Sequence, residues 1–221
     1  MREWTQTDRR IGTWSAFSAA TIGLIYVVVG LIGVVARPPR SEPLRQVDPY
    51  LAILEILIIL SAIVLVTMMA ALHAYAPSDR KTFSLTALAF AICFAVLTCG
   101  AHFASLTVGR QIDARGLPLL SHQLSFAQWP TLAMSVDLLA SDFFLGLALL
   151  FAAQVLKGEA MLRVRLAMTI AGTLCLLGTL GPASGHLRIQ YLGIAGYAFV
   201  LPVACALLAV FFWRGRTSES G

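Results

Sequence analysis

The sequence has very little charge. Only 12% of its 221 residues are charged and 58% are hydrophobic, whereas a soluble domain carries about 25% charged residues. Several apolar stretches exceed the roughly 18 residues that mark a membrane-spanning helix. The net charge of +5 is therefore no sign of nucleic-acid binding, because basic residues in such proteins mostly flank helix ends. The composition predicts an integral membrane protein that contacts the lipid bilayer and has no nucleic-acid partner.

Cysteine is also scarce. The four cysteines all fall inside apolar stretches, and none belongs to a C-x-x-C pair, so neither a cysteine-based zinc site nor a redox motif is indicated. We expect them to be small buried side chains. The sequence also lacks a Walker A loop, a Gly-rich nucleotide loop, an H-E-x-x-H motif and a haem attachment motif. The sequence therefore shows none of these catalytic or cofactor-binding motifs, and it leaves any cofactor unknown.

Long apolar stretches, in contrast, dominate the chain. Each is long enough to cross a hydrocarbon core of about 30 Å at about 1.5 Å per residue. None shows the strict alternation that is typical of strands. The sequence therefore predicts an all-α fold, a single transmembrane domain over 1–221 built as a bundle of six transmembrane helices. The expected helices span about 14–36, 50–75, 83–108, 130–156, 166–184 and 191–213.

The distribution of basic residues predicts the orientation. Ten of the sixteen lysines and arginines lie on the side that holds both termini, and six lie on the other side. The positive-inside rule then places both termini in the cytoplasm. The longest connection, 109–129, lies outside and mixes charged residues with apolar pieces. That pattern favours a short interfacial helix that lies on the bundle.

Two aspartates lie in the middle of the fourth apolar stretch. A centrally placed aspartate costs about 2.5–3.5 kcal/mol on insertion scales, so such residues normally face the bundle interior or water. Asp137 and Asp142 are separated by five residues, which places them about 140° apart around a helix axis. We therefore expect this helix to be central and to present polar groups to more than one neighbour. Asp142 lies near the bilayer centre, where desolvation favours its protonated form.

Three residues of other helices lie at a depth similar to that of Asp137. Counted from the outer helix ends at about 1.5 Å per residue, Glu55, His102 and Asp137 all lie about 7–10 Å deep, and Tyr197 lies about 9 Å deep. A neutral histidine between two carboxylates can bind a divalent cation, and a protonated one can hold or relay a proton. The candidate metal ligands are Glu55, His102 and Asp137. The candidate ligand- or ion-binding residues are Glu55, His102, Asp137, Asp142 and Tyr197.

Three functions fit this polar core. We favour a buried site that binds or passes a proton, a cation or a small amphipathic ligand. The second is an intramembrane enzyme that uses carboxylate and histidine acid–base or metal chemistry. The third is a structural or sensory helix-bundle subunit. A transporter of six helices without internal repeats is a small unit, so we expect homo-oligomers in that case.

The layout resembles a known group. The six-helix arrangement, the acidic "LEIL" that contains Glu55 and the glycine-rich "YLGIAGY" near the end resemble an uncharacterised group of six-helix bacterial integral membrane proteins of unknown function. This resemblance implies a multi-pass protein of the bacterial inner (cytoplasmic) membrane. It implies nothing about activity.

Overall fold

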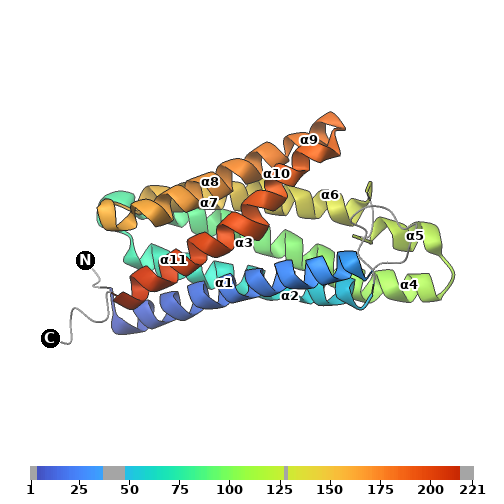
Figure 1. The fold of residues 1–221 in the computed structure, drawn as a ribbon, viewed down its shortest axis with the longest axis horizontal. Helices are drawn as coiled ribbons and strands as arrows, with labels where there is room; N and C mark the ends of the chain where they lie inside the picture. The colour runs from blue at the N-terminus through green and yellow to red at the C-terminus, as the bar shows by residue number, and fades with distance from the viewer. Residues whose placement is uncertain (1–3, 37–47, 127–128, 215–221) are drawn as a thin grey trace.

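The computed structural model describes residues 4–36, 48–126 and 129–214, and these form an elongated bundle of long helices (Figure 1). No strand occurs among the described residues. Six helical spans are long and apolar enough to cross a membrane: Gln6–Val35, Tyr50–Tyr75, Ser78–Ile112, Leu132–Val155, Glu159–Ser184 and Leu187–Arg214. The predicted all-α bundle of six such helices is confirmed.

The six spans are divided into shorter elements where the helix type changes. The α-helices are α1 (Gln6–Val35), α2 (Tyr50–Tyr75), α3 (Lys81–Ala104), α4 (Arg110–Ala114), α5 (Pro118–Gln123), α6 (Leu132–Leu138), α7 (Leu145–Val155), α8 (Leu162–Gly178), α9 (Leu180–Ser184), α10 (Tyr191–Ile194) and α11 (Leu201–Arg214). The 3₁₀ turns are η1 (Ser78–Arg80), η4 (Glu159–Met161) and η5 (Leu187–Gln190). The π-helical segments are η2 (Ser105–Gly109), η3 (Leu139–Phe144) and η6 (Ala195–Val200).

The first helix begins eight residues before the expected residue 14. Thr5 caps it: the Thr5 hydroxyl accepts a hydrogen bond from the Asp8 amide at 3.2 Å, and the Asp8 carboxylate accepts one from the Thr5 amide at 3.0 Å. This capping box starts a helix in polar sequence. An apolar stretch marks only the length of helix that crosses the hydrocarbon core. It therefore places the start of this helix too late.

The described ends of the chain meet at one end of the bundle. The Trp4 ring packs on Tyr75 and Phe212, with ring centroids 4.9 and 5.2 Å apart. We call this end the terminus end. The opposite end, which carries α4 and α5, is the loop end (Figure 1). The expected interfacial stretch thus contains two short helices, α4 and α5, that form a hairpin.

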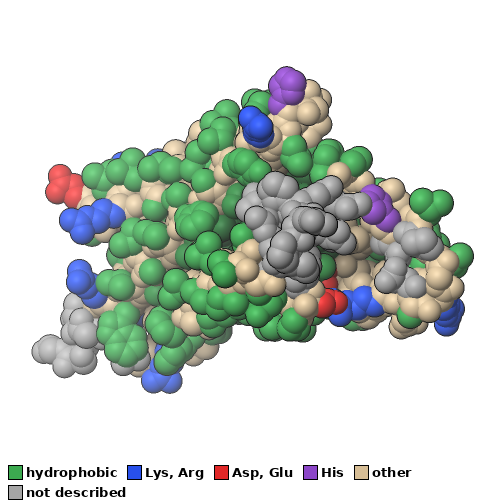
Figure 2. Space-filling model, turned by 45° about the vertical axis from the view of Figure 1, so that its right-hand side comes forward, with side chains coloured by type: hydrophobic (Ala, Val, Ile, Leu, Met, Phe, Trp, Pro, Cys, Tyr) green, Lys and Arg blue, Asp and Glu red, His purple; other side chains and the backbone are tan. Residues whose placement is uncertain are grey.

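The outer surface of the spans is apolar. Figure 2 shows hydrophobic side chains over the middle of one face, with lysine and arginine toward the ends. Cys175 and Cys205 are buried as predicted, but Cys99 is only half-buried and Cys93 is exposed. Its position on the outward face of α3 explains the difference, because a thiol is apolar enough to lie on a surface that contacts lipid.

Small residues bring the helices close together inside. A Cβ placed on Gly23 of α1 would lie 2.5 Å from Pro202 Cγ of α11, so only glycine allows this approach. The π-helical segment η6 ends two residues before Pro202, where proline removes a backbone donor and favours a local distortion. The last span is therefore irregular near Pro202, where its backbone forms a widened turn.

Candidate functional site

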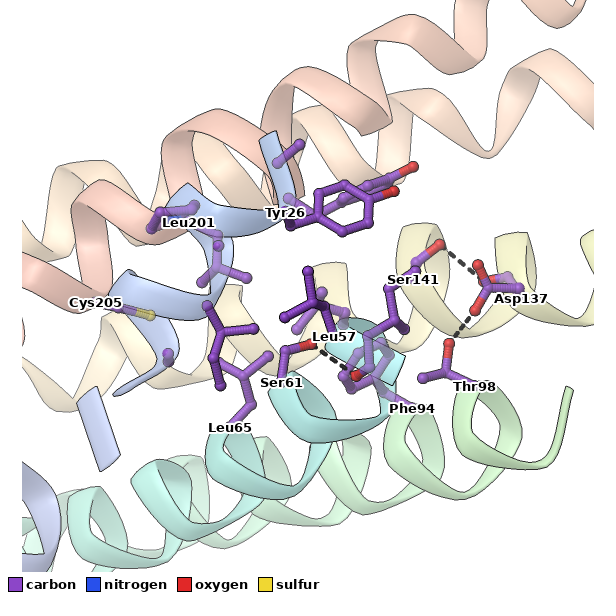
Figure 3. Close-up of a pocket in the computed structure, with 18 residues that line it drawn as sticks. Tyr26, Leu57, Ser61, Leu65, Phe94, Thr98, Asp137, Ser141, Leu201 and Cys205 are labelled. Atoms are coloured by element: carbon purple, nitrogen blue, oxygen red, sulfur yellow. Dashed lines mark hydrogen bonds between the residues drawn. The ribbon is translucent and has the colours of Figure 1, made fainter. Parts of the chain in front are cut away.

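A cavity of about 90 Å³ lies between five of the six spans (Figure 3). Its walls are mostly apolar, and side chains such as Leu57, Leu65, Phe94 and Leu201 line it. One water needs about 10–15 Å³ by this measure. The cavity therefore has room for several waters or for a ligand of a few heavy atoms. Its polar lining residues are Tyr26, Ser61, Thr98, Asp137, Ser141 and Tyr197.

Asp137 is the acidic group that lines this cavity. Thr131 starts α6 by accepting a hydrogen bond from the Met134 amide at 3.2 Å, and Asp137 follows two turns later. The Thr98 hydroxyl of α3 donates a hydrogen bond to Asp137 Oδ1. The Asp137 side chain is 18% exposed although it lies within an apolar span. Its carboxylate can therefore meet a molecule in the cavity.

His102 lies directly beside Asp137. Its Nε2 is 3.4 Å from Asp137 Oδ1, an ion-pair distance if the imidazole is protonated. The His102 ring is buried and stacks on Phe126 of the loop after α5, with ring centroids 4.0 Å apart. Neither ring nitrogen forms a hydrogen bond with a described residue. The position of the ring is thus set by stacking and packing rather than by a hydrogen bond.

Glu55 lies next to this pair, toward the loop end. The Ser105 hydroxyl donates a hydrogen bond of 2.5 Å to Glu55 Oε1. Ser105 follows His102 by three residues, so both lie on one face of the helix, and Glu55 is close enough to interact electrostatically with His102. Arg110 Nη2 lies 4.0 Å from Glu55 Oε2 and 2.8 Å from Asp48 Oδ1. Glu55 therefore lies just beneath an ion pair at the surface.

The structure thus brings His102 and Asp137 into contact and places Glu55 nearby. Among the described residues, however, no three histidine, cysteine, aspartate or glutamate side chains form a group that could hold a metal ion. Glu55, His102 and Asp137 do not make such a coordination set, so the geometry gives the predicted metal site no support.

Tyr197 and Asp142 occupy different positions. Tyr197 lines the cavity, and its hydroxyl lies 3.5 Å from Gln190 Nε2. Asp142 of η3 is fully buried and does not line the cavity. Its carboxyl group packs against Gly178 of α8 and Gly193 of α10. Gln190 is also near Asp142, but neither carboxyl oxygen has a partner in hydrogen-bond geometry among the described residues.

The two aspartates therefore face different neighbours, as the angle of about 140° between them predicts. Asp137 faces α3 and the cavity, and Asp142 faces α8 and α10. The π-helical segment η3 begins just after Asp137 and contains Asp142. Such segments are frequent at functional sites, and η6 likewise carries Tyr197.

Several residues of the site were not expected from the sequence. Thr98 precedes His102 by four residues, a spacing that places both on one helix face, so it could have been found. Tyr26 is a polar side chain well inside the first span and gave a weaker signal of the same kind. Phe126 lies in a loop without periodicity, so nothing in the sequence indicates that it covers His102.

Comparison with known proteins does not identify the chain. No family model matches it, and neither a curated protein nor a solved structure shows significant similarity to it. The resemblance to the six-helix bacterial group stays a prediction. The geometry of the cavity is therefore the basis for a functional conclusion.

Proposed function

We propose that this is a multi-pass inner-membrane protein whose cavity binds or passes a small amphipathic cation, with Asp137 as its counter-ion. One observation carries the proposal: a partly exposed carboxylate lies on the wall of an otherwise mostly apolar cavity. A cation that leaves water needs an opposite charge or strong polar partners. An apolar body of the same molecule gains from the surrounding leucine and phenylalanine side chains.

The other lining groups suit the same ligand. Tyr26, Ser61 and Tyr197 line the cavity. Their hydroxyl oxygens are possible acceptors for an ammonium group, and the tyrosine rings offer a favourable face to a cation. The volume of about 90 Å³ is smaller than the roughly 150 Å³ of an engineered cavity that binds benzene. We therefore expect a ligand of only a few heavy atoms, such as a short alkylammonium ion.

The alternatives have less in their favour. A structural subunit needs only a packed interior and gains nothing from a cavity that contains an acid, and a sensory subunit would need the same ligand site as the one proposed. The enzyme alternative rests on the same carboxylate and imidazole but lacks an observation that points to a particular reaction. If the termini are cytoplasmic, as proposed from the basic residues, the loop end with Glu55 and His102 faces the outside. Homo-oligomerisation is part of the proposal for a transporting form.

Binding of n-butylammonium and of 1-butanol to the purified protein in mild detergent tests this proposal. The two molecules have the same number of heavy atoms and differ in charge. We expect the cation to bind at least about tenfold more tightly, which corresponds to about 1.4 kcal/mol, as measured by titration calorimetry. Glu159→Gln, at an exposed acid of the terminus end, is the control and should leave both affinities unchanged. Equal or tighter binding of 1-butanol would contradict a cation site.

A further inference from the structure

We infer that Glu55 and His102 form a proton route between the loop end and Asp137, so that the cavity exchanges its cation for a proton. This inference rests on the proposed function and gives the site its coupling ion. The route begins at the ion pair between Arg110 and Asp48. These side chains are 41% and 57% exposed, whereas Glu55 directly beneath them is 1% exposed. The exposed Arg110 and Asp48 side chains therefore lie between the buried Glu55 carboxylate and water at the surface.

The next step leads from Glu55 to His102. Glu55 Oε1 accepts the hydrogen bond from Ser105, and Glu55 Oε2 has no hydrogen-bond partner among the described residues. Ser105 lies one turn from His102 on the same helix face. The Glu55 carboxylate thus has one oxygen held toward the helix of His102 and another available for a proton.

The last step leads from His102 to Asp137. The 3.4 Å between Nε2 and Oδ1 allows transfer after a small movement, because catalytic hydrogen bonds need about 2.6–3.2 Å. Neither nitrogen of His102 is held by a hydrogen bond to a described residue. An imidazole in this situation can take up a proton on one nitrogen and release it from the other.

The charge and the protons balance in this exchange. When an alkylammonium ion enters the cavity, protonated Asp137 gives its proton to His102 Nε2 and becomes the carboxylate that pairs with the cation. Because neither ring nitrogen of His102 has a hydrogen-bond partner among the described residues, the imidazolium passes a proton to the Glu55 carboxylate through one intervening water. Glu55 then releases a proton to water beside Arg110 and Asp48. One positive charge enters and one proton leaves.

Other titratable groups face Asp137 from several elements. They are Cys99 of α3, Tyr26 of α1, Tyr197 of η6 and Asp142 of η3. Thiols and phenols ordinarily titrate above the range of about pH 5–8 in which histidine changes its charge. Asp142 faces α8 and α10 instead of the cavity. His102 is therefore the neighbour best suited to pass a proton to Asp137.

A pH-jump experiment without any ligand tests the route. Protein in mild detergent is mixed rapidly into acidic buffer, and the carbonyl band of protonated carboxyl groups is followed by infrared spectroscopy. The band lost in Asp137→Asn identifies the signal of Asp137. We expect Glu55→Gln and His102→Asn to slow its appearance at least tenfold without changing its final size. Glu159→Gln, an exposed acid at the opposite end, should not change the rate.

Each remaining outcome also decides the question. Unchanged rates in both variants, or no pH-dependent Asp137 band in the wild-type protein, would overturn the route. If Glu55→Gln does not fold, Glu55→Asp keeps the acid but withdraws it by one methylene, and it should show a smaller slowing. Because no cation is present, a failure of n-butylammonium binding contradicts the proposed function alone and is distinguishable from a failure of the route.

Discussion

Gly193→Ala is expected to destabilise the bundle strongly, by roughly 1–3 kcal/mol or more, the range for overpacking in a close-packed interior. A Cβ at this position would lie 2.2 Å from Asp142 Oδ1 and 2.8 Å from its Cγ. The Asp142 carboxyl group is fully buried, and its Oδ2 also lies 3.0 Å from a Cβ placed on Gly178. Gly178 of α8 packs equally closely on Gly193, since a Cβ on Gly178 would lie 2.7 Å from Gly193 Cα. Thermal unfolding in detergent measures the loss.

Two variants show whether the clash is the cause. Gly100→Ala on α3 places a methyl group where no described atom lies within 4 Å, so its unfolding temperature should equal that of the wild type or exceed it, since alanine favours helix more than glycine does. The double variant Asp142→Ala with Gly193→Ala removes the clashing carboxyl group and should recover most of the lost stability. An unaffected Gly193→Ala protein, or a double variant no better than the single one, would show that this contact is not as tight as described.

Asp137→Asn is expected to lower the affinity for n-butylammonium about 100-fold. The substitution keeps the shape of the side chain and leaves the Thr98 hydroxyl able to donate to the amide oxygen, but it removes the charge that pairs with the cation. Breaking one partner of a desolvated ion pair costs about 3–5 kcal/mol, and partial exposure of Asp137 to the cavity reduces that cost. Affinity for 1-butanol should change less than about threefold, since an alcohol needs no counter-ion.

Asp142→Asn provides the matched control for this experiment. Asp142 is an aspartate of the same span, but it does not line the cavity. Calorimetric titration should therefore give an n-butylammonium affinity within about twofold of the wild type. Equal losses in both variants would mean that the overall charge of the core, rather than a contact with Asp137, controls binding.

The sequence alone predicts the spans well because lipid imposes a simple requirement. A segment must be apolar and about 20 residues long to cross the hydrocarbon core, and α2 occupies the predicted residues 50–75. Helix starts in polar sequence obey a different rule, and the capping box of Thr5 and Asp8 extends α1 beyond the apolar stretch. Apolar counting alone does not detect that extension.

The level of a polar side chain along the bundle was partly predictable from residue counting, and the direction in which it points around the helix axis was less so. Counting residues placed Glu55, His102 and Asp137 at one level, and the structure puts His102 against Asp137. The azimuth of each helix, however, depends on packing between segments far apart in the chain. For that reason three features could not be derived from the sequence. They are the packing of Asp142 against two glycines, the stacking of Phe126 on His102 and the absence of a three-ligand metal group among the described residues.

The most direct test of the central claim is the distance from a bound cation to Asp137. Solid-state NMR of ¹⁵N-labelled n-butylammonium with protein that carries ¹³C-labelled aspartate measures this distance through dipolar dephasing. We predict that the ammonium nitrogen lies about 4 Å from an aspartate side-chain carboxyl carbon, as in an ion pair. The dephasing should disappear in Asp137→Asn and persist in Asp142→Asn. Dephasing that is absent in the wild-type protein, or that survives the loss of Asp137, would contradict a cation site at this carboxylate.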